Sequence, residues 1–296
     1  MKILLISGTH NRHLYFFRRI LGLDAEFSAI VMQRENQMPP VPPNLLSRDQ
    51  KLFTRHFETR FAVENAHFGT PSPEETFAKI PHHFCEPDSL NTSEVAEFVS
   101  TQEPDLAIVF GPDLLKPPLF DALPAITINL HLGLSPWYRG AATLFWPFYF
   151  LEPNFAGGTF HKVTASPDAG NLLHQSVPSL SAGDGIHDVA AKTVEAATED
   201  FVTITQHMIE GANYTLVPQK AQGKLFSRFD FRPSHLRMLY EVFDDDIVSS
   251  FLAGNLSARE PNLHRALSLS QPRLARPAEN RKVRMRQSLQ GISGEH

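Results

Sequence analysis

Asn129 and His131 are the residues of this chain whose types and spacing best suit chemistry. They lie two positions apart at the end of an apolar run that starts at position 125. Side chains at positions i and i+2 of an extended segment point to the same face, so we expect the amide and the imidazole to enter one cleft together. An amide can hold a carbonyl oxygen and an imidazole can move a proton. This pair therefore suits acyl transfer better than metal binding or hydride transfer.

Asp168 is the third candidate, because a carboxylate can orient an imidazole and favour its charged form. Each of the three residues also has a purely structural interpretation when it is taken alone. Asn129 could be a turn residue at a strand end, His131 a hydrogen-bonded structural histidine, and Asp168, which follows a proline, a turn residue. Only their combination with the motifs described below favours a catalytic role.

The order of apolar segments around these residues predicts an α/β fold with a mostly parallel sheet and helices on both faces. The chain opens with a strand, a turn, a helix and a second strand, which is the order typical of parallel sheets. Strands are predicted at residues 2–7, 27–32, 82–85, 106–110, 126–130, 158–165 and 172–177, and helices at residues 12–21, 48–68, 91–102, 142–150 and 186–210.

Residues 33–75 look like an insertion between two units of the sheet. Prolines between positions 38 and 43 predict an extended linker at its start. The helix that follows carries phenylalanines whose spacing predicts one helical face, and this face could pack on the core, form a dimer interface or cover the site as a lid. These phenylalanines are Phe53, Phe57, Phe61 and Phe68.

The chain is predicted to have three parts. Residues 1–211 form the catalytic domain, residues 212–256 a small C-terminal subdomain, and residues 257–296 a basic tail that is partly disordered. An alternative for the tail is a basic arm that touches an anionic substrate or RNA. Its basic residues include Arg265, Arg273, Arg276, Arg281, Lys282, Arg284 and Arg286.

The composition narrows the classes of protein to which this chain could belong. The 296 residues, 42% hydrophobic and 20% charged, are ordinary for a soluble globular protein, and the net charge of −5 disfavours a general nucleic-acid binder. The single cysteine, Cys85, excludes an intramolecular disulfide, and the 14 histidines include no His-Glu-x-x-His pattern, so no metal is expected. The chain has no long apolar run and opens directly on a strand, which predicts no membrane span, no signal peptide and a cytoplasmic location.

Four motifs together resemble the 10-formyltetrahydrofolate-dependent formyltransferase family. They are Asn129-x-His131, Pro136-x-Tyr138-Arg139-Gly140, Gly158-Thr-Phe-His161 and Asp168-Ala-Gly170. The resemblance covers residues 1–211 and is sharp between 106 and 175. It implies a Rossmann-like formyltransferase core, 10-formyltetrahydrofolate as the formyl donor, no metal, and a catalytic set of an asparagine, a histidine two residues later and an aspartate about forty residues on. Asn129, His131 and Asp168 match that spacing.

Formyl transfer generates negative charge on an oxygen, and a donor aimed at that oxygen is worth about 3–4 kcal/mol. Asn129 is expected to hold this oxygen and orient the reactants. His131 is expected to stabilise the same oxygen or to carry the proton of the amine. Asp168 is expected to orient His131 and to collect the proton through a water.

The resemblance also implies binding residues. The loop after the strand at 106–110 borders the donor's pterin pocket, and its residues are Phe110, Gly111, Pro112, Asp113, Leu114 and Leu115. Residues expected to bind the acceptor are His10, Tyr138, Arg139 and Gly140. One of His161 and His174 could contact substrate, although both are better explained as strand residues. No Gly-x-Gly-x-x-Gly fingerprint of a nicotinamide dinucleotide follows the first strand.

The donor is better specified than the acceptor. Methionyl-tRNA formyltransferases in the family carry a C-terminal barrel domain of about a hundred residues, and the shorter C-terminal part here, with the negative net charge, disfavours tRNA. We therefore expect a small-molecule amine, most plausibly a nucleotide-linked amino sugar, and a homodimer is possible. The alternatives are a methionyl-tRNA formyltransferase and a catalytically idle folate- or nucleotide-binding protein.

Overall fold

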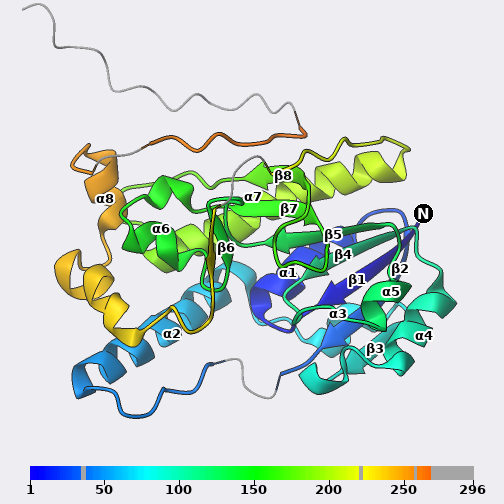
Figure 1. Cartoon of the computed structure of the whole chain (residues 1–296), viewed down its shortest axis with the longest axis horizontal. Coiled ribbons are helices and arrows are strands. Elements are labelled where there is room, and N and C mark those ends of the chain that lie inside the picture. The colour runs from blue at the N-terminus through cyan, green and yellow to red at the C-terminus, as the bar shows by residue number, and fades with distance from the viewer. Residues whose placement is uncertain (35–37, 220–222, 257–258, 268–296) are drawn as a thin grey trace, which may run out of the picture.

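The computed structural model describes residues 1–34, 38–219, 223–256 and 259–267. Its main sheet has seven strands in the order β3-β2-β1-β4-β5-β7-β8 (Figure 1). Pairing is parallel from β3 through to β5 and antiparallel between β5 and β7 and between β7 and β8. The strands are β1 Lys2–Ser7, β2 Glu26–Met32, β3 His82–Cys85, β4 Leu106–Phe110, β5 Ile126–His131, β7 Gly158–Lys162 and β8 Leu172–Ser176.

Helices cover both faces of this sheet (Figure 1), which confirms the predicted Rossmann-like α/β class. One face packs against α1, α2, α3 and α7, and the other against α4 and α5. The α-helices are α1 Asn11–Ile20, α2 Ser47–Phe68, α3 Pro73–Phe77, α4 Ser93–Gln102, α5 Leu119–Ala122, α6 Phe145–Tyr149, α7 Ile186–Ile209 and α8 Ile247–Leu252. The described residues also form short 3-10 helices at Pro87–Ser89, Pro153–Phe155 and Pro233–His235 and a π-helix at Met238–Val242.

The strand β1 shows why the centre of the sheet is stable. Ile3 and Leu5 face the apolar cluster that contains α1 and α7, whereas Leu4 and Ile6 face the cluster that contains α4. All four side chains are buried. A strand that is covered on both faces needs a continuous apolar run rather than alternation, and this run supplies it.

In the helix α2, the four phenylalanines that were predicted to share one helical face differ in burial. Phe53 and Phe68 are buried and Phe57 is half-buried, but the side chain of Phe61 is 44% exposed. Each step of four residues turns the helix surface by about 40° beyond a full turn, so a row spaced by four leaves the buried stripe after two steps. The face packs on the core at its two ends and lines a cavity between them.

The described residues of the range 212–256 pack into an apolar cluster that they share with residues of the predicted catalytic domain. A two-stranded parallel sheet joins β6 (Tyr138–Gly140) to β9 (Lys224–Phe226). Phe226 and Leu239 are buried in one apolar cluster with Tyr138 and Phe145, which belong to the predicted catalytic domain. This second cluster therefore merges the predicted C-terminal subdomain with the rest of the fold.

The predicted tail is partly ordered. His264 exchanges hydrogen bonds with Gln175 of β8, with N···O distances of 2.9 and 3.0 Å, and the backbone N–H of Ala266 donates to His174 Nδ1. The side chain of Leu267 is only 8% exposed and belongs to the main core. Residues 259–267 are thus the ordered part of a tail that was predicted to be partly disordered, and the arginines from 273 on lie outside the described residues. No helix among the described residues is long and apolar enough to span a membrane.

Candidate active site

The strand β5 delivers both Asn129 and His131 to the carboxyl edge of the sheet. Asn129 is paired in register with Val109 of the parallel strand β4 and with His161 of the antiparallel strand β7. His131 is the last residue of the strand, and its side chain is buried. The two side chains lie on the same side of the strand, as the spacing predicts, because His131 contacts one carboxylate and Asn129 contacts a second histidine that is bound to the same carboxylate.

That carboxylate belongs to Asp168, in the loop between β7 and β8. Its Oδ2 lies 3.3 Å from Nδ1 of His131 and accepts a hydrogen bond of 2.8 Å from the backbone N–H of Gly140. Its backbone is held in a left-handed conformation, with φ of 50°, and its carbonyl accepts a hydrogen bond from Gln219. A non-glycine residue in this conformation persists only where its surroundings fix it. These contacts therefore position the carboxylate.

His161 completes the cluster and was not among the predicted catalytic residues. Its Nε2 lies 3.3 Å from Oδ1 of Asp168 and 3.2 Å from Nδ2 of Asn129. The two imidazoles thus lie on either side of one carboxylate. The sequence shows His161 as a strand residue, and only the antiparallel pairing of β7 with β5 brings it opposite Asn129.

A backbone carbonyl fixes the protonation of His131. Its Nε2 lies 2.9 Å from the carbonyl oxygen of Tyr138, and because a carbonyl only accepts, the proton is assigned to Nε2. Burial lowers the pKa of His131 below its ordinary value, although Asp168 and the Tyr138 carbonyl both raise it. Burial therefore favours the neutral imidazole, in which the unprotonated Nδ1 faces Asp168.

Asp168 stays ionised beside it. Burial raises the pKa of this carboxyl, but the neighbouring His131, His161 and the N–H of Gly140 outweigh burial and lower the pKa to about 2. A neutral imidazole with a free Nδ1 next to a fixed carboxylate can accept a proton, because the carboxylate then stabilises the imidazolium. The arrangement therefore combines a proton acceptor with an amide donor.

The structure separates the residues expected to bind the acceptor. The phenol of Tyr138 donates to Glu152 and its ring stacks on Phe226, so this residue reaches the site only through its backbone carbonyl. Gly140 also contributes backbone, and its φ of 90° favours glycine. Arg139 donates to the carbonyl of Gly223 at 3.3 Å and supports the loop.

His10 lies at the start of α1, away from the Asn129–His131–Asp168 cluster. Its ring meets that of His13 edge-on, with 5.3 Å between the ring centroids. Burial, Arg12, Arg60 and Arg34 lower the pKa of His10 to about 2, so its imidazole is neutral. Among the described residues, no contact joins His10 to the cluster of Asn129, His131 and Asp168.

The predicted donor loop, residues 110–115, leaves β4 directly beside Asn129. Phe110 is buried, and Gly111 has a φ of 91° and lies so close to the ring of His13 that a Cβ would meet it at 2.1 Å. Asn91 fixes the loop by donating to the carbonyl of Leu114 and accepting from the N–H of Lys116. The side chain of Leu114 is exposed, so the loop presents an apolar side chain at the surface.

The fold and the polar cluster together define a Rossmann-like α/β protein with its site at the carboxyl ends of the central strands. A family model described as "Formyl transferase" matches residues 53–205, more than half of the chain, and the chain belongs to that family.

Two sets of known proteins are similar to it. A methionyl-tRNA formyltransferase of Koribacter versatilis is 32% identical over 130 residues, and one of Bifidobacterium adolescentis is 31% identical over 115 residues. These matches cover 44% and 39% of this chain but only 41% and 34% of the relatives.

Among solved structures, a 4-N formyltransferase from Francisella tularensis matches with a TM-score of 0.50 and 17% identity, covering 78% of this chain and 77% of that one. A phosphoribosylglycinamide formyltransferase from Anaplasma phagocytophilum matches with a TM-score of 0.51 and 14% identity, covering 77% and 98%. At these identities the likeness shows a shared fold.

Proposed function

We propose that this protein is an N-formyltransferase that moves a formyl group from 10-formyltetrahydrofolate to the primary amine of a small acceptor. The observation that carries the proposal is the carboxylate of Asp168 at 3.3 Å from His131, on the side of β5 that also presents Asn129. Membership of the formyl transferase family supports the same reaction.

Transfer joins the acceptor nitrogen to the formyl carbon, breaks the bond between that carbon and the donor nitrogen, and moves one proton from the first nitrogen to the second. Asn129 has two amide N–H groups, of which one points to His161 and the other serves the formyl oxygen as its charge grows. His131 accepts the amine proton at Nδ1, and Asp168 stabilises the resulting imidazolium.

The loop at residues 110–115 fits the donor. It starts at the end of β4, one position beyond the residue that pairs with Asn129, so a molecule lying on it brings its formyl group to the amide. The apolar side chain of Leu114 is exposed, and the carboxyl ends of α/β strands are where such folds bind ligands. When bound, the donor supplies an activated formyl group.

The acceptor that we favour is a nucleotide-linked amino sugar. The second candidate is methionyl-tRNA, because the most similar relatives named above are methionyl-tRNA formyltransferases. One experiment separates them: 10-formyltetrahydrofolate is offered with a panel of nucleotide-linked amino sugars and with charged methionyl-tRNA, and release of tetrahydrofolate is followed for each. We expect release with a sugar nucleotide and none in the Asn129→Ala variant.

If tetrahydrofolate were released only with methionyl-tRNA, the acceptor would be methionyl-tRNA and not a nucleotide-linked amino sugar. Turnover that Asn129→Ala leaves unchanged would contradict the proposed reaction itself and favour an idle binding protein.

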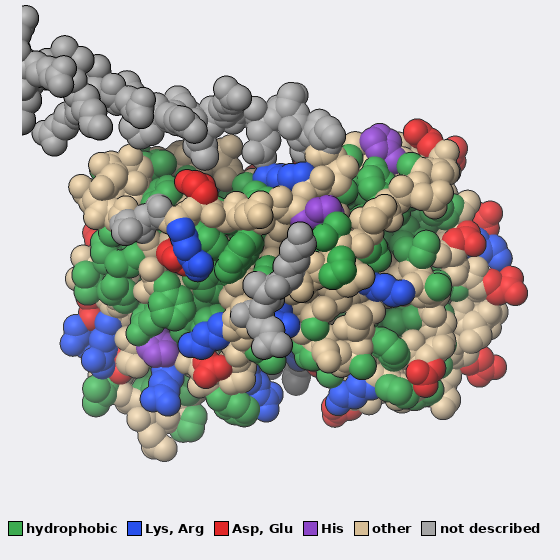
Figure 2. Space-filling view, turned by 45° about the horizontal axis from the view of Figure 1, so that its top comes forward, with side chains coloured by type: hydrophobic (Ala, Val, Ile, Leu, Met, Phe, Trp, Pro, Cys, Tyr) green, Lys and Arg blue, Asp and Glu red, His purple; other side chains and the backbone are tan. Residues whose placement is uncertain are grey.

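A homodimer and a cytoplasmic location stay predictions. Hydrophobic side chains gather over the end of the molecule that holds α6 and α8 (Figure 2), and four of the exposed ones are Phe150, Leu225, Phe229 and Val242. Exposed apolar surface is typical of interfaces, and it supports the homodimer. Sedimentation velocity of the full chain would test it.

A further inference from the structure

The position of the proton on His131 depends on a segment that forms turns. Nε2 of His131 is bound to the carbonyl of Tyr138, and residues 132–137, which we call the connecting segment, lie between the two. A segment that is not part of a helix or a sheet is held by individual hydrogen bonds to its neighbours. The contacts of the connecting segment therefore decide where the Tyr138 carbonyl lies.

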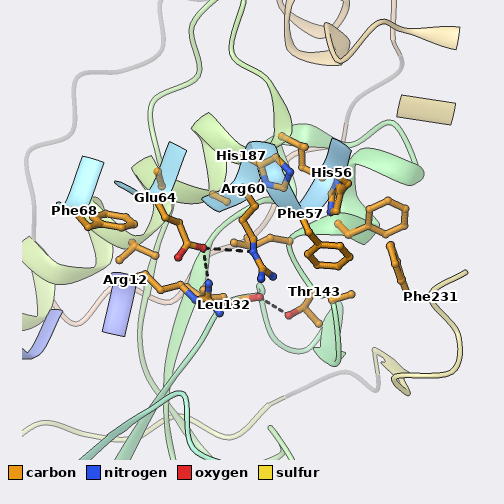
Figure 3. A pocket seen from close by; sticks show the side chains of 17 residues that line it. Arg12, His56, Phe57, Arg60, Glu64, Phe68, Leu132, Thr143, His187 and Phe231 are labelled. Carbon is orange, nitrogen blue, oxygen red and sulfur yellow. Dashed lines mark hydrogen bonds and ion pairs between the residues drawn. The ribbon is translucent and has the colours of Figure 1, made fainter. Parts of the chain in front are cut away.

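Two threonines hold the part of the connecting segment that follows β5. The Thr143 hydroxyl donates a hydrogen bond to the Leu132 carbonyl (Figure 3). The Thr159 hydroxyl donates to the Gly133 carbonyl at 2.7 Å and accepts from the backbone N–H of Ser135 at 3.0 Å. These contacts leave the carbonyl of Ser135 for a third partner.

That partner is Gln175 of β8. Nε2 of its amide donates to the carbonyl of Ser135 at 2.6 Å and to the Thr159 hydroxyl at 3.3 Å. Its Oε1 accepts from the backbone N–H of His264 at 3.0 Å. The side chain of Gln175 is only 1% exposed, so water does not compete for these hydrogen bonds. One buried amide thus joins the connecting segment to residues 259–267.

A turn couples Ser135 to Tyr138. The N–H of Tyr138 donates to the carbonyl of Leu134 at 2.9 Å, which closes a turn over residues 134–138. The carbonyl that Gln175 binds belongs to this turn. A change in its position therefore also moves the Tyr138 carbonyl that is bound to His131.

An amide suits this position better than a hydrocarbon or a carboxylate. One side of the Gln175 side chain faces a carbonyl and supplies donors, and the other side faces an N–H and supplies an acceptor. Methionine has a similar volume but would leave both backbone groups unpaired in a buried place, which is unfavourable. A carboxylate would keep the acceptor for His264 and lose the donors for Ser135.

We propose that Gln175 is a positioning residue, which fixes the Tyr138 carbonyl through Ser135 and so keeps the proton of His131 on Nε2. It touches none of the reacting atoms. The inference rests on the proposed function, because a proton on Nε2 leaves Nδ1 free to accept the proton of the amine. Without Gln175 the imidazole also populates its other tautomer, whose proton on Nδ1 is stabilised by Asp168.

Nitrogen NMR of the full-length protein, labelled with ¹⁵N-histidine, tests the inference without turnover. Protonated and unprotonated ring nitrogens resonate at different chemical shifts, so the spectrum reports the tautomer. The original protein should carry the proton on Nε2 of His131, and in Gln175→Met both ring signals should move toward the average of the two tautomers. Gln206→Met is the matched control, because it removes an amide of α7 that donates to Glu210, and it should leave the His131 signals unchanged.

Turnover provides a second readout. A misplaced proton acceptor slows the chemical step without removing a binding contact, so we expect Gln175→Met to lower kcat by roughly 10- to 100-fold and to change the KM of the acceptor by less than about twofold. A purely structural role of Gln175 would lower stability and leave both kcat and the His131 signals of the folded variant unchanged.

A second variant keeps the test decisive if Gln175→Met fails to fold. Gln175→Glu keeps the volume and the acceptor for His264, but at mildly alkaline pH its carboxylate cannot donate to the Ser135 carbonyl. The His131 signals should change in the same direction as in Gln175→Met. Unchanged His131 signals in either folded variant overturn the inference.

Failure of the inference and failure of the proposed function give different results. If the original protein releases tetrahydrofolate with an acceptor but Gln175→Met changes neither kcat nor the His131 signals, only the inference is wrong. If the signals change but the original protein turns over no acceptor, the proposed function is wrong and Gln175 still positions the imidazole. A changed tautomer together with a lowered kcat supports both, whereas a lowered kcat with unchanged signals overturns the inference.

Discussion

At the scale of single residues, the notable feature is one carboxylate that lies between two imidazoles. Each imidazole is also bound to a backbone carbonyl. Nε2 of His131 is bound to the Tyr138 carbonyl, and Nδ1 of His161 to the Lys162 carbonyl at 3.0 Å. Each ring therefore directs its other nitrogen toward Asp168. Such outer contacts fix the tautomer, so a backbone carbonyl rather than another side chain determines which nitrogen of the neutral His131 ring carries the proton.

Replacement of Asp168 by asparagine should retain the fold and lose turnover. Asparagine keeps the shape of the side chain and can still accept the hydrogen bond from Gly140, but it cannot stabilise an imidazolium at His131. We expect turnover to fall by roughly 10²–10⁴-fold, with an unchanged circular dichroism spectrum. Turnover close to that of the original protein would remove Asp168 from the mechanism.

The same carboxyl makes stability depend on pH. Its folded pKa of about 2 lies below the ordinary 3.8, so its contribution is complete above the ordinary value and is lost as the pH falls through the folded one. The shift corresponds to about 2 kcal/mol. Urea unfolding measured from about pH 5 down to about pH 2 should show a shallower loss of stability in Asp168→Asn. If the free energy of unfolding fell equally steeply with decreasing pH in both proteins, the lowered pKa of Asp168 would be contradicted.

At the scale of elements, α2 connects the two apolar clusters and lines a cavity that it shares with α1 and α7. Phe68 belongs to the main core and Phe53 to the second cluster. Polar contacts fix the helix as well, since Asp49 accepts two hydrogen bonds of 2.7 Å from Arg237, and Asn65 accepts one of 2.6 Å from Asn11. A helix held at both ends is part of the fold rather than a detachable lid.

Two substitutions in α2 compare the contribution of a buried phenylalanine to stability with that of an exposed one. The side chain of Phe53 is 5% exposed and that of Phe61 is 44% exposed. Phe53→Ala should lower the free energy of unfolding by about 3–5 kcal/mol, because it leaves a cavity in the second cluster. Phe61→Ala, the matched control, should change it by no more than about 0.5 kcal/mol. Chemical denaturation of both variants measures this, and equal losses would show that Phe61 is buried in an assembly.

At the scale of the whole molecule, the candidate site lies where the two apolar clusters meet. Asn129 and His131 come from the main sheet, whereas the Tyr138 carbonyl and the Gly140 N–H come from β6 beside the second cluster. Residues beyond α7 contribute too, since Gln219 donates to the carbonyls of Asp168 and Gly170 at 2.8 Å. The site is therefore complete only when segments far apart in the sequence have packed.

The segment 259–267 should stabilise the whole fold. It hydrogen-bonds to His174 and Gln175, and Leu267 enters the main core. A chain ending at residue 256 should unfold at a temperature lower by roughly 5–10 °C in calorimetry. Leu267→Ala in the full chain should show a smaller decrease in the same direction. An unchanged midpoint in the shortened chain would mean that the segment does not contribute to stability.

The sequence by itself determined the α/β class, most strands and the pairing of Asn129 with His131, because apolar runs and i, i+2 spacing are local properties of the chain. Tertiary structure alone decided the place of His161, the backbone role of Tyr138, the order of residues 259–267 and the cavity between α1, α2 and α7. Each of these depends on contacts between segments far apart along the chain: β7 against β5, β6 against β9, residues 259–267 against β8, and α2 against α1 and α7. No local pattern encodes such contacts, since burial and charge compensation exist only after the chain has packed.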